Sequence, residues 1–198
     1  RADEHQNEYV PANAERLAWL TGFTGSAGVV IALQDKAALF VDGRYTLQAP
    51  QQVDARAFAV VPLAETSPEK WLERHLPKGA RFGYDSSLHT PAQAARLEKA
   101  VAAAGGGRVA SERNTVGAIA SGRPASPWAA ARRHPPRYAG EAAQKKIARV
   151  AAALGADALL VSDPHAMAWA FNIRGADVAH PPLPLGYALI EKTGAARL

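Results

Sequence analysis

A glycine-rich loop followed by two short apolar segments, within residues 16–45, constrains the fold most. Glycine occurs at every third position in the loop, at Gly22, Gly25 and Gly28. Glycines ahead of a buried segment let the backbone turn sharply or approach a neighbour closely, which a Cβ would prevent. The apolar segments 29–31 and 37–41 are separated by a polar turn at 34–36. The pattern predicts a hairpin at the centre of a sheet.

A polar turn, Asp42–Tyr45, follows the second apolar segment directly. Open α/β sheets collect binding groups beyond the carboxyl ends of their buried strands. The guanidinium of Arg44 offers a planar fork of donors that suits carboxylates and carbonyl groups, as in peptide recognition. Alternatively, Arg44 pairs with Asp42 or another acid and holds the turn. We expect Asp42 and Tyr45 to orient the turn rather than contact a ligand.

Strand and helix signals alternate between residues 45 and 107. We expect a short helix at 45–53 interrupted near Pro50, strands at 57–61 and 81–84, and helices that begin after Ser67 and Thr90. Both capping residues are followed by proline at the first helical position, which favours helix initiation. Such alternation predicts an α/β domain with a mixed or mainly parallel sheet.

A proline- and arginine-rich stretch divides the chain. Residues 121–138 hold four prolines and no periodic apolar pattern, which is typical of a linker. We therefore expect a first domain at 1–122, a linker at 123–139 and a second domain at 140–198. The second domain should contain a helix at 140–154, a buried strand at 157–161, a helix after Asp163 and a strand at 187–190. The order of elements indicates that the two α/β domains are related.

The chain has a net charge of +5, and its basic excess is concentrated in residues 123–149. This segment has seven basic residues and one acidic residue, Glu141. We interpret this excess as a solvated linker and an exposed helix face, because no aromatic platform or nucleic-acid motif accompanies it. The chain has no cysteine and no apolar run of the length that crosses a bilayer. We expect a cytoplasmic protein without nucleic-acid or membrane partners.

The common catalytic patterns are missing. Ser26 lies between glycines, but Thr24 occupies the position where a nucleophile elbow needs glycine, and the serine precedes a strand. The loop glycines match neither a dinucleotide motif nor a P-loop. The six histidines are scattered, and no H-E-x-x-H motif accompanies His5, Glu4 and Glu8. We therefore assign no catalytic or metal-binding residue to this chain.

Five motifs in one order resemble a known family. They are HQNEYVP at 5–11, WLTGFTGSAG at 19–28, LFVDGRYTLQ at 39–48, GYD with LHT at 83–90, and NIRGADV at 172–178. Together they resemble the two N-terminal α/β domains of the long, three-domain Xaa-Pro aminopeptidase, of the creatinase/prolidase superfamily. The resemblance implies that the first strand and helix of domain one, the end of domain two and the catalytic pita-bread domain lie outside the chain.

The resemblance also implies a function. The parent enzyme would be a metallopeptidase that releases the residue before proline, with two manganese ions bound by two Asp, one His and two Glu of the catalytic domain. The present domains would break no bond. They would narrow substrate access, contact the bound peptide through Arg44 and form a homodimer interface. Two alternatives remain: another member of the superfamily, or a stand-alone α/β binding module that uses the basic segment 123–149.

Departures from the family pattern carry further expectations. The pattern has an acid and a tryptophan where this chain has Gly117 and Ala120, and an acid where it has His165. We expect Trp128 to fill the space at Ala120. In the last motif, Arg174 and Asp177 are close enough to pair, and we expect a turn against the prolines at 181–184. The alternative is contact with the catalytic domain or with a partner subunit.

Overall fold

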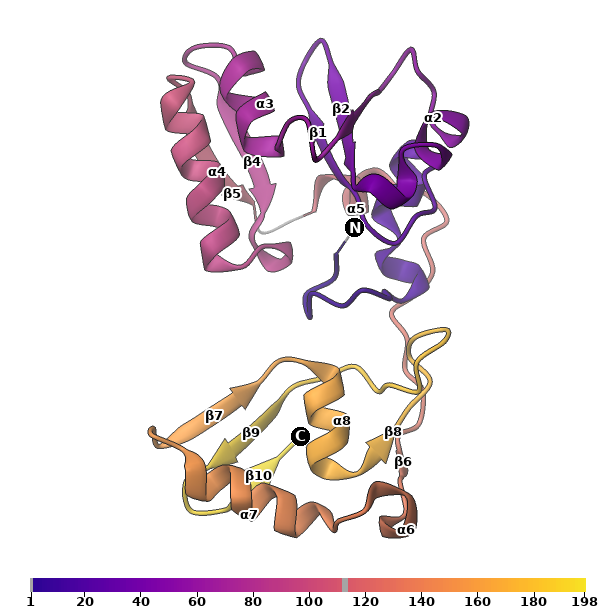
Figure 1. Cartoon of the computed structure of the whole chain (residues 1–198), viewed down its shortest axis with the longest axis vertical. Helices are drawn as coiled ribbons and strands as arrows, with labels where there is room; N and C mark the ends of the chain where they lie inside the picture. Colours follow the sequence, from indigo (N-terminus) through magenta and orange to yellow (C-terminus); the bar gives the residue numbers. More distant parts are fainter. Residues whose placement is uncertain (1, 112–113) are drawn as a thin grey trace. The chain divides into compact units, whose positions relative to one another are not determined.

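The computed structural model describes residues 2–111 and 114–198 (Figure 1). The chain divides into two compact units. Unit 1 comprises residues 14–123 and the few residues before His5, and unit 2 comprises residues 5–13 and 124–198. In the described residues, no helix is both long and apolar enough to cross a membrane.

Unit 1 is built around a mixed three-stranded sheet. Strands β1 (Val29–Ala32) and β2 (Ala37–Val41) are antiparallel, and β3 (Ala59–Pro62) pairs with β2 in parallel. A second sheet pairs β4 (Arg81–Asp85) with β5 (Gly107–Ser111) in parallel. The predicted central hairpin is therefore confirmed, as are the two strands expected at 57–61 and 81–84, each within two residues.

Two helices of unit 1 begin at the predicted capping residues. Ser67 accepts a hydrogen bond from the backbone of Lys70, and Thr90 forms a capping box with Gln93. The helix at Pro50 is not interrupted, because proline in the first turn replaces an N–H that has no intrahelical partner. The helices are α1 (Arg16–Thr21), α2 (Gln48–Gln52), α3 (Pro68–His75), α4 (Pro91–Ala103) and α5 (Thr115–Ile119), with 3₁₀ turns at η1 (Ala12–Ala14), η2 (Gly43–Tyr45) and η3 (Ser86–Leu88).

Strand β2 is buried on both faces, and its alternating side chains join two hydrophobic clusters. Ala38 and Phe40 pack with Trp71, Leu72, Leu97 and Val101 of α3 and α4. Leu39 and Val41 pack with Leu17, Phe23, Ala49 and Val53 on the opposite side. Figure 1 shows α3 and α4 side by side. Burial on two faces explains why β2 is continuously apolar rather than alternating.

Unit 2 contains a three-stranded sheet ordered β10-β9-β7 and two principal helices. Its elements are β6 (Arg132–Arg133), α6 (Pro136–Ala139), α7 (Ala143–Ala153), β7 (Ala158–Val161), α8 (Pro164–Phe171), β8 (Ile173–Arg174), β9 (Ala188–Glu191) and β10 (Ala196–Arg197). All described strand pairs of this unit are antiparallel, so the mixed sheet we expected is found in unit 1 alone. A tight turn joins β9 to β10, and such a turn permits only antiparallel pairing.

One expectation about burial in unit 2 is wrong. In β7 only Val161 is buried, and the side chain of Leu160 is 66% exposed. The strand pairs with β9 on one side and forms the edge of the sheet as described. Trp128 of unit 2 is 98% exposed, and its packing at Ala120 of unit 1 stays a prediction.

The N-terminal segment 5–13 belongs to unit 2, although its sequence position suggests the first domain. The Nδ1 atom of His5 lies 2.9 Å from the carbonyl oxygen of Ser162, and the His5 ring lies 4.8 Å from that of Tyr187. Asn13 donates to the hydroxyl of Ser126 at 3.2 Å. Residues 5–13 therefore belong to unit 2, although most of unit 1 follows them in the sequence.

Candidate functional site

The turn after β2 is fixed by its own acid. The side chain of Asp42 caps η2 by accepting a hydrogen bond from the backbone N–H of Arg44 at 3.0 Å. Asp42 lies in the extended conformation that an N-cap residue requires. Strand β2 is buried on both faces, and the cap directly follows it. The cap therefore fixes the backbone position of Arg44 where the chain leaves the core.

Arg44 pairs with Asp42 and remains largely exposed. Its Nε lies 3.1 Å from Oδ1 and its Nη2 lies 2.8 Å from Oδ2, with 58% of the arginine side chain exposed. Hydrogen bonds from Arg44 hold the pKa of the Asp42 carboxyl below its usual value. The pairing that we considered as the structural alternative is thus present. An exposed guanidinium also has donors that can turn to a ligand, so the substrate-binding role of Arg44 stays a prediction.

Tyr45 ties the turn to the glycine-rich loop. Its phenol oxygen accepts a hydrogen bond from the backbone N–H of Ser26 at 3.0 Å and lies 2.7 Å from the Ser26 hydroxyl. The contact with the Ser26 hydroxyl has the larger effect and the hydrogen bond from the Ser26 backbone the smaller, and both lower the pKa of Tyr45. The Tyr45 ring packs edge-to-face on Phe23 at 5.3 Å, and a Cβ at Gly25 would lie 2.2 Å from the Phe23 ring. The loop glycine therefore serves close packing.

The Ser26 hydroxyl thus contacts a phenol rather than an imidazole. Serine nucleophiles are activated by an adjacent general base, usually a histidine imidazole, and a phenol that itself accepts a hydrogen bond from the Ser26 backbone is no such base, so this contact does not support a catalytic serine. Ser26 instead positions Tyr45, over whose ring the guanidinium of Arg44 lies at 5.2 Å. Loop and turn form one polar surface at the end of β2.

The second motif, 172–178, forms a turn against the proline stretch. Asp177 does not receive its described hydrogen bonds from Arg174; its two carboxylate oxygens accept from the backbones of Ala129 and Leu185, each at 2.8 Å. The backbone N–H of Gly175 donates to Pro182 at 3.1 Å, and a Cβ on that glycine would lie 2.5 Å from the nitrogen of Pro184. The motif serves to hold the linker and the proline stretch together within unit 2.

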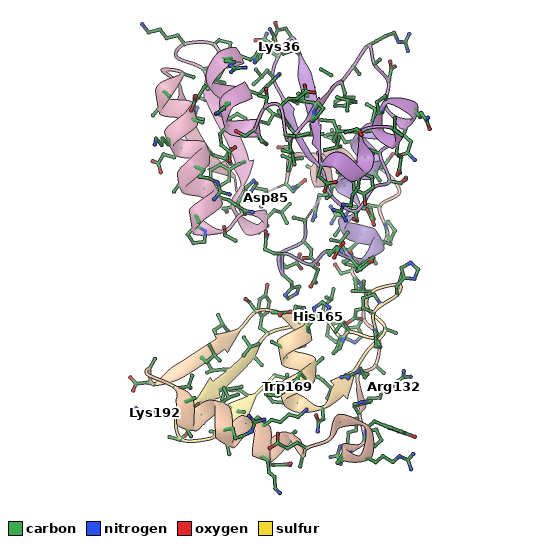
Figure 2. All side chains as sticks on the ribbon, viewed as in Figure 1. Lys36, Asp85, Arg132, His165, Trp169 and Lys192 are labelled. Carbon is green, nitrogen blue, oxygen red and sulfur yellow. The ribbon has the colours of Figure 1, made fainter. Side chains whose placement is uncertain are left out.

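One residue of the basic segment is buried, contrary to our expectation. The ammonium of Lys146 donates to the side chain of Asn172 at 2.8 Å and to the carbonyl oxygen of Trp169 at 3.1 Å, and Lys146 is only 3% exposed. Figure 2 shows Trp169 on α8. Sequence analysis missed this contact, although Lys146 lies one helical turn before Val150 and so borders the apolar stripe of α7.

Metal ligands do not gather in the part of the chain that the structure describes. No group of three or more His, Asp or Glu side chains in residues 2–111 and 114–198 is placed to hold a metal ion. His165, at the start of α8 (Figure 2), is exposed and contacts Asp163, its neighbour two residues earlier. The described contacts of His5 and His165 are thus with different groups rather than with a shared centre.

Fold and site together define a class: tandem α/β domains with polar turns, of which the one after β2 leaves an arginine exposed. A model of the creatinase/prolidase N-terminal domain matches residues 9–112, and a second model of that description matches residues 122–198. The chain belongs to the creatinase/prolidase N-terminal domain family. The resemblance inferred from the five motifs is confirmed, and so is the α/β fold class.

Curated relatives extend beyond the present chain. A probable Xaa-Pro aminopeptidase P of Aspergillus niger is 36% identical over 96% of this chain and 32% of its own length. One from Coccidioides posadasii is 34% identical over 98% of this chain and 33% of its own. A crystal structure of X-prolyl aminopeptidase from Caenorhabditis elegans, described as a cytosolic enzyme with a di-nuclear active site, matches with a TM-score of 0.91 at 27% identity. That match covers 96% of this chain and 32% of the enzyme. The chain spans about a third of these relatives.

Proposed function

We propose that this chain is the non-catalytic N-terminal part of a Xaa-Pro aminopeptidase. The names of the curated relatives support the assignment, and so does the similarity to the solved X-prolyl aminopeptidase along nearly the whole chain. In this proposal the domains span 1–122 and 140–198, joined by the linker 123–139. They shape substrate access and contribute to a homodimer interface in a cytoplasmic enzyme. Bond cleavage belongs to a catalytic domain outside this chain, which would hold two manganese ions.

Arg44 is the residue that we propose contacts the peptide, and its geometry is the observation that carries the proposal. Asp42 and Tyr45 fix the start of its side chain, while 58% of that side chain is exposed. A guanidinium can exchange an exposed carboxylate partner for a substrate carbonyl or carboxylate at small cost, because exposed ion pairs contribute about 0–1 kcal/mol. Its planar fork then fixes the peptide by two parallel hydrogen bonds.

Peptide hydrolysis by two proteins tests this function. We expect the full-length product of the gene to release the first residue of peptides with proline in second position, and a chelator to abolish that release. We expect the 198-residue chain alone to give no turnover, with or without Mn²⁺. Chelator-sensitive turnover by the short chain would contradict its non-catalytic role. Absence of Xaa-Pro cleavage by the full-length product would favour the stand-alone binding module.

A further inference from the structure

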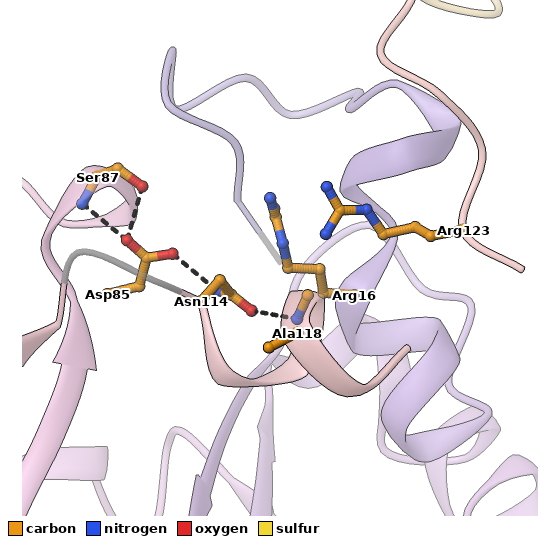
Figure 3. A pocket seen from close by; sticks show the side chains of 7 residues that line it. Arg16, Asp85, Ser87, Asn114, Ala118 and Arg123 are labelled. Atoms are coloured by element: carbon orange, nitrogen blue, oxygen red, sulfur yellow. Dashed lines mark hydrogen bonds between the residues drawn. The ribbon is translucent and has the colours of Figure 1, made fainter. Parts of the chain in front are cut away.

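A pocket of about 490 Å³ opens in unit 1, outside the Arg44 turn. It lies where α1, the end of β4, α5 and the residues after α5 approach one another (Figure 3). Its ionisable lining groups are two guanidinium groups, of Arg16 and Arg123, and one carboxylate, of Asp85. In Figure 3 the two guanidinium groups lie on one side and Asp85 with Ser87 on the other. Two like charges that line one pocket create a potential that attracts anions.

The guanidinium of Arg16 has buried donors without acceptors. Its Nε and Nη1 atoms are shielded from solvent, and neither has a hydrogen-bond partner in the structure as described. Buried donors are nearly always satisfied, and leaving one unpaired costs about 1–3 kcal/mol, more when it is charged. An acceptor that enters the pocket would remove this cost.

Asp85 does not supply that acceptor. One of its oxygens accepts hydrogen bonds from the backbone and hydroxyl of Ser87, at 2.9 and 2.6 Å. The other accepts from the side chain of Asn114 at 2.8 Å. Asp85 attracts Arg16 through space, but its hydrogen bonds in the described part of the chain come from these neutral groups. The pocket therefore keeps a surplus of positive charge.

Gly117 keeps the space beside Arg123 open. It lies in α5, where its backbone N–H donates to the side chain of Asn114 at 2.8 Å. A Cβ built on Gly117 would lie 2.4 Å from Nη1 of Arg123, so any larger residue would have to displace that guanidinium. The missing side chain thus leaves Arg123 in the pocket together with Arg16.

We propose that this pocket binds a small oxyanion, of the carboxylate or phosphate type, between Arg16 and Arg123. Each guanidinium can donate two parallel hydrogen bonds to such an anion, and one anion would neutralise the charge surplus. The proposal concerns a site separate from Arg44 and does not depend on peptidase function.

Titration of the 198-residue chain with inorganic phosphate and with acetate tests the proposal, with sodium chloride added to keep ionic strength constant. We expect one or both anions to raise the thermal midpoint of unfolding with increasing concentration, because a ligand that binds only the folded state stabilises it. A response to both anions indicates a general carboxylate-type site, and a response to phosphate alone indicates a phosphate-type site. No response to either anion beyond that to chloride would overturn the proposal.

Matched variants localise the response. We expect Arg16→Gln and Arg123→Gln each to weaken anion binding about tenfold or more, since each removes charge-assisted hydrogen bonds. Arg56→Gln, which removes an exposed arginine of the same unit outside the pocket, should bind as the wild type does. Gly117→Asp would displace the Arg123 guanidinium and place an internal carboxylate in the pocket, so it should abolish the response to added anion. Wild-type binding by Gly117→Asp, or by the double variant Arg16→Gln/Arg123→Gln, would overturn the site.

Discussion

Lys146 shows how a single buried charge can join two helices. Its ammonium lies at the C-terminal end of α8, where it donates to the carbonyl oxygen of Trp169 and the side chain of Asn172. Asn172 occupies the left-handed conformation that ends the helix, with φ of 50°, and donates to the carbonyl of Glu141. A cation at this end is favoured by the helix dipole, and the ammonium lies 4.7 Å from the centre of the Trp169 ring. Lys146 therefore fixes α7 against the end of α8.

Lys146→Met should destabilise unit 2 by about 1–3 kcal/mol, because two buried acceptors would lose their donor. Lys145→Met is the matched control, since Lys145 precedes it on the same helix but is exposed. Amide hydrogen exchange of α7 and α8 measures the effect. Equal exchange in the two variants would show that the ammonium is not a stabilising link.

The lowered pKa of Asp42 predicts a pH-dependent contribution to the stability of unit 1. Hydrogen bonds from Arg44 stabilise the carboxylate in the folded state, so its contribution is present above the unfolded pKa of about 3.9 and is lost as pH falls through the lower folded pKa. Asp42→Asn should therefore lower the midpoint at neutral pH, and its difference from wild type should shrink below about pH 4. Thermal unfolding between neutral pH and pH 2.5 measures this. A constant difference across the series would contradict the assigned cause.

At the scale of elements, local signals in the sequence were sufficient where neighbours along the chain determine the structure. The caps at Ser67 and Thr90, the hairpin and the turn at Asp42 depend on residues within a few positions, and all were predicted. The exposure of β7 was not, because an apolar run has the same composition at an edge as in the centre of a sheet. The link at Lys146 joins positions 23 and 26 residues apart, and the pocket at Arg16 joins residues about a hundred positions apart, so sequence spacing indicates neither.

The exposure of β7 leads to a contrast between two apolar residues of the same sheet. Leu160 is 66% exposed and Ile190 on β9 is 1% exposed. Leu160→Lys should change the free energy of unfolding by no more than about 0.5 kcal/mol, as for most surface substitutions. Ile190→Ala should cost about 2–5 kcal/mol, because it leaves a cavity in the core. Urea titration of both variants measures these values. A large loss in Leu160→Lys would show that β7 is covered in solution.

At the scale of the whole molecule, both units belong to one family and both carry polar turns. The turns differ in the groups that their charged side chains contact. The motif 172–178 directs Asp177 to backbone groups of its own unit. In the turn after β2, the guanidinium of Arg44 pairs with Asp42 and its side chain is 58% exposed. This difference favours the first unit as the one that contacts substrate. Sequence alone identified Arg44 but could not separate pairing with Asp42 from binding a peptide.

The chain contains an internal control for distinguishing the two roles of Arg44, ion pairing with Asp42 and peptide binding. Arg56 pairs with Asp54 two residues earlier, with Nε to Oδ1 at 3.1 Å and Nη2 to Oδ2 at 2.8 Å, which matches the pair formed by Arg44 and Asp42. Arg56 belongs to the same unit and is also exposed. Replacement of either arginine by alanine removes the same type of local ion pair, so loss of that pair should affect the two variants alike.

The most direct measurement is therefore kcat/KM of the full-length enzyme for an Xaa-Pro peptide, in Arg44→Ala and in Arg56→Ala. We predict a decrease of about tenfold to a hundredfold for Arg44→Ala, the loss expected when a charge-assisted hydrogen bond to substrate is removed. Arg56→Ala should match the wild type. Equal kcat/KM values for the two variants would contradict the account, because Arg44 would then do no more than hold its turn.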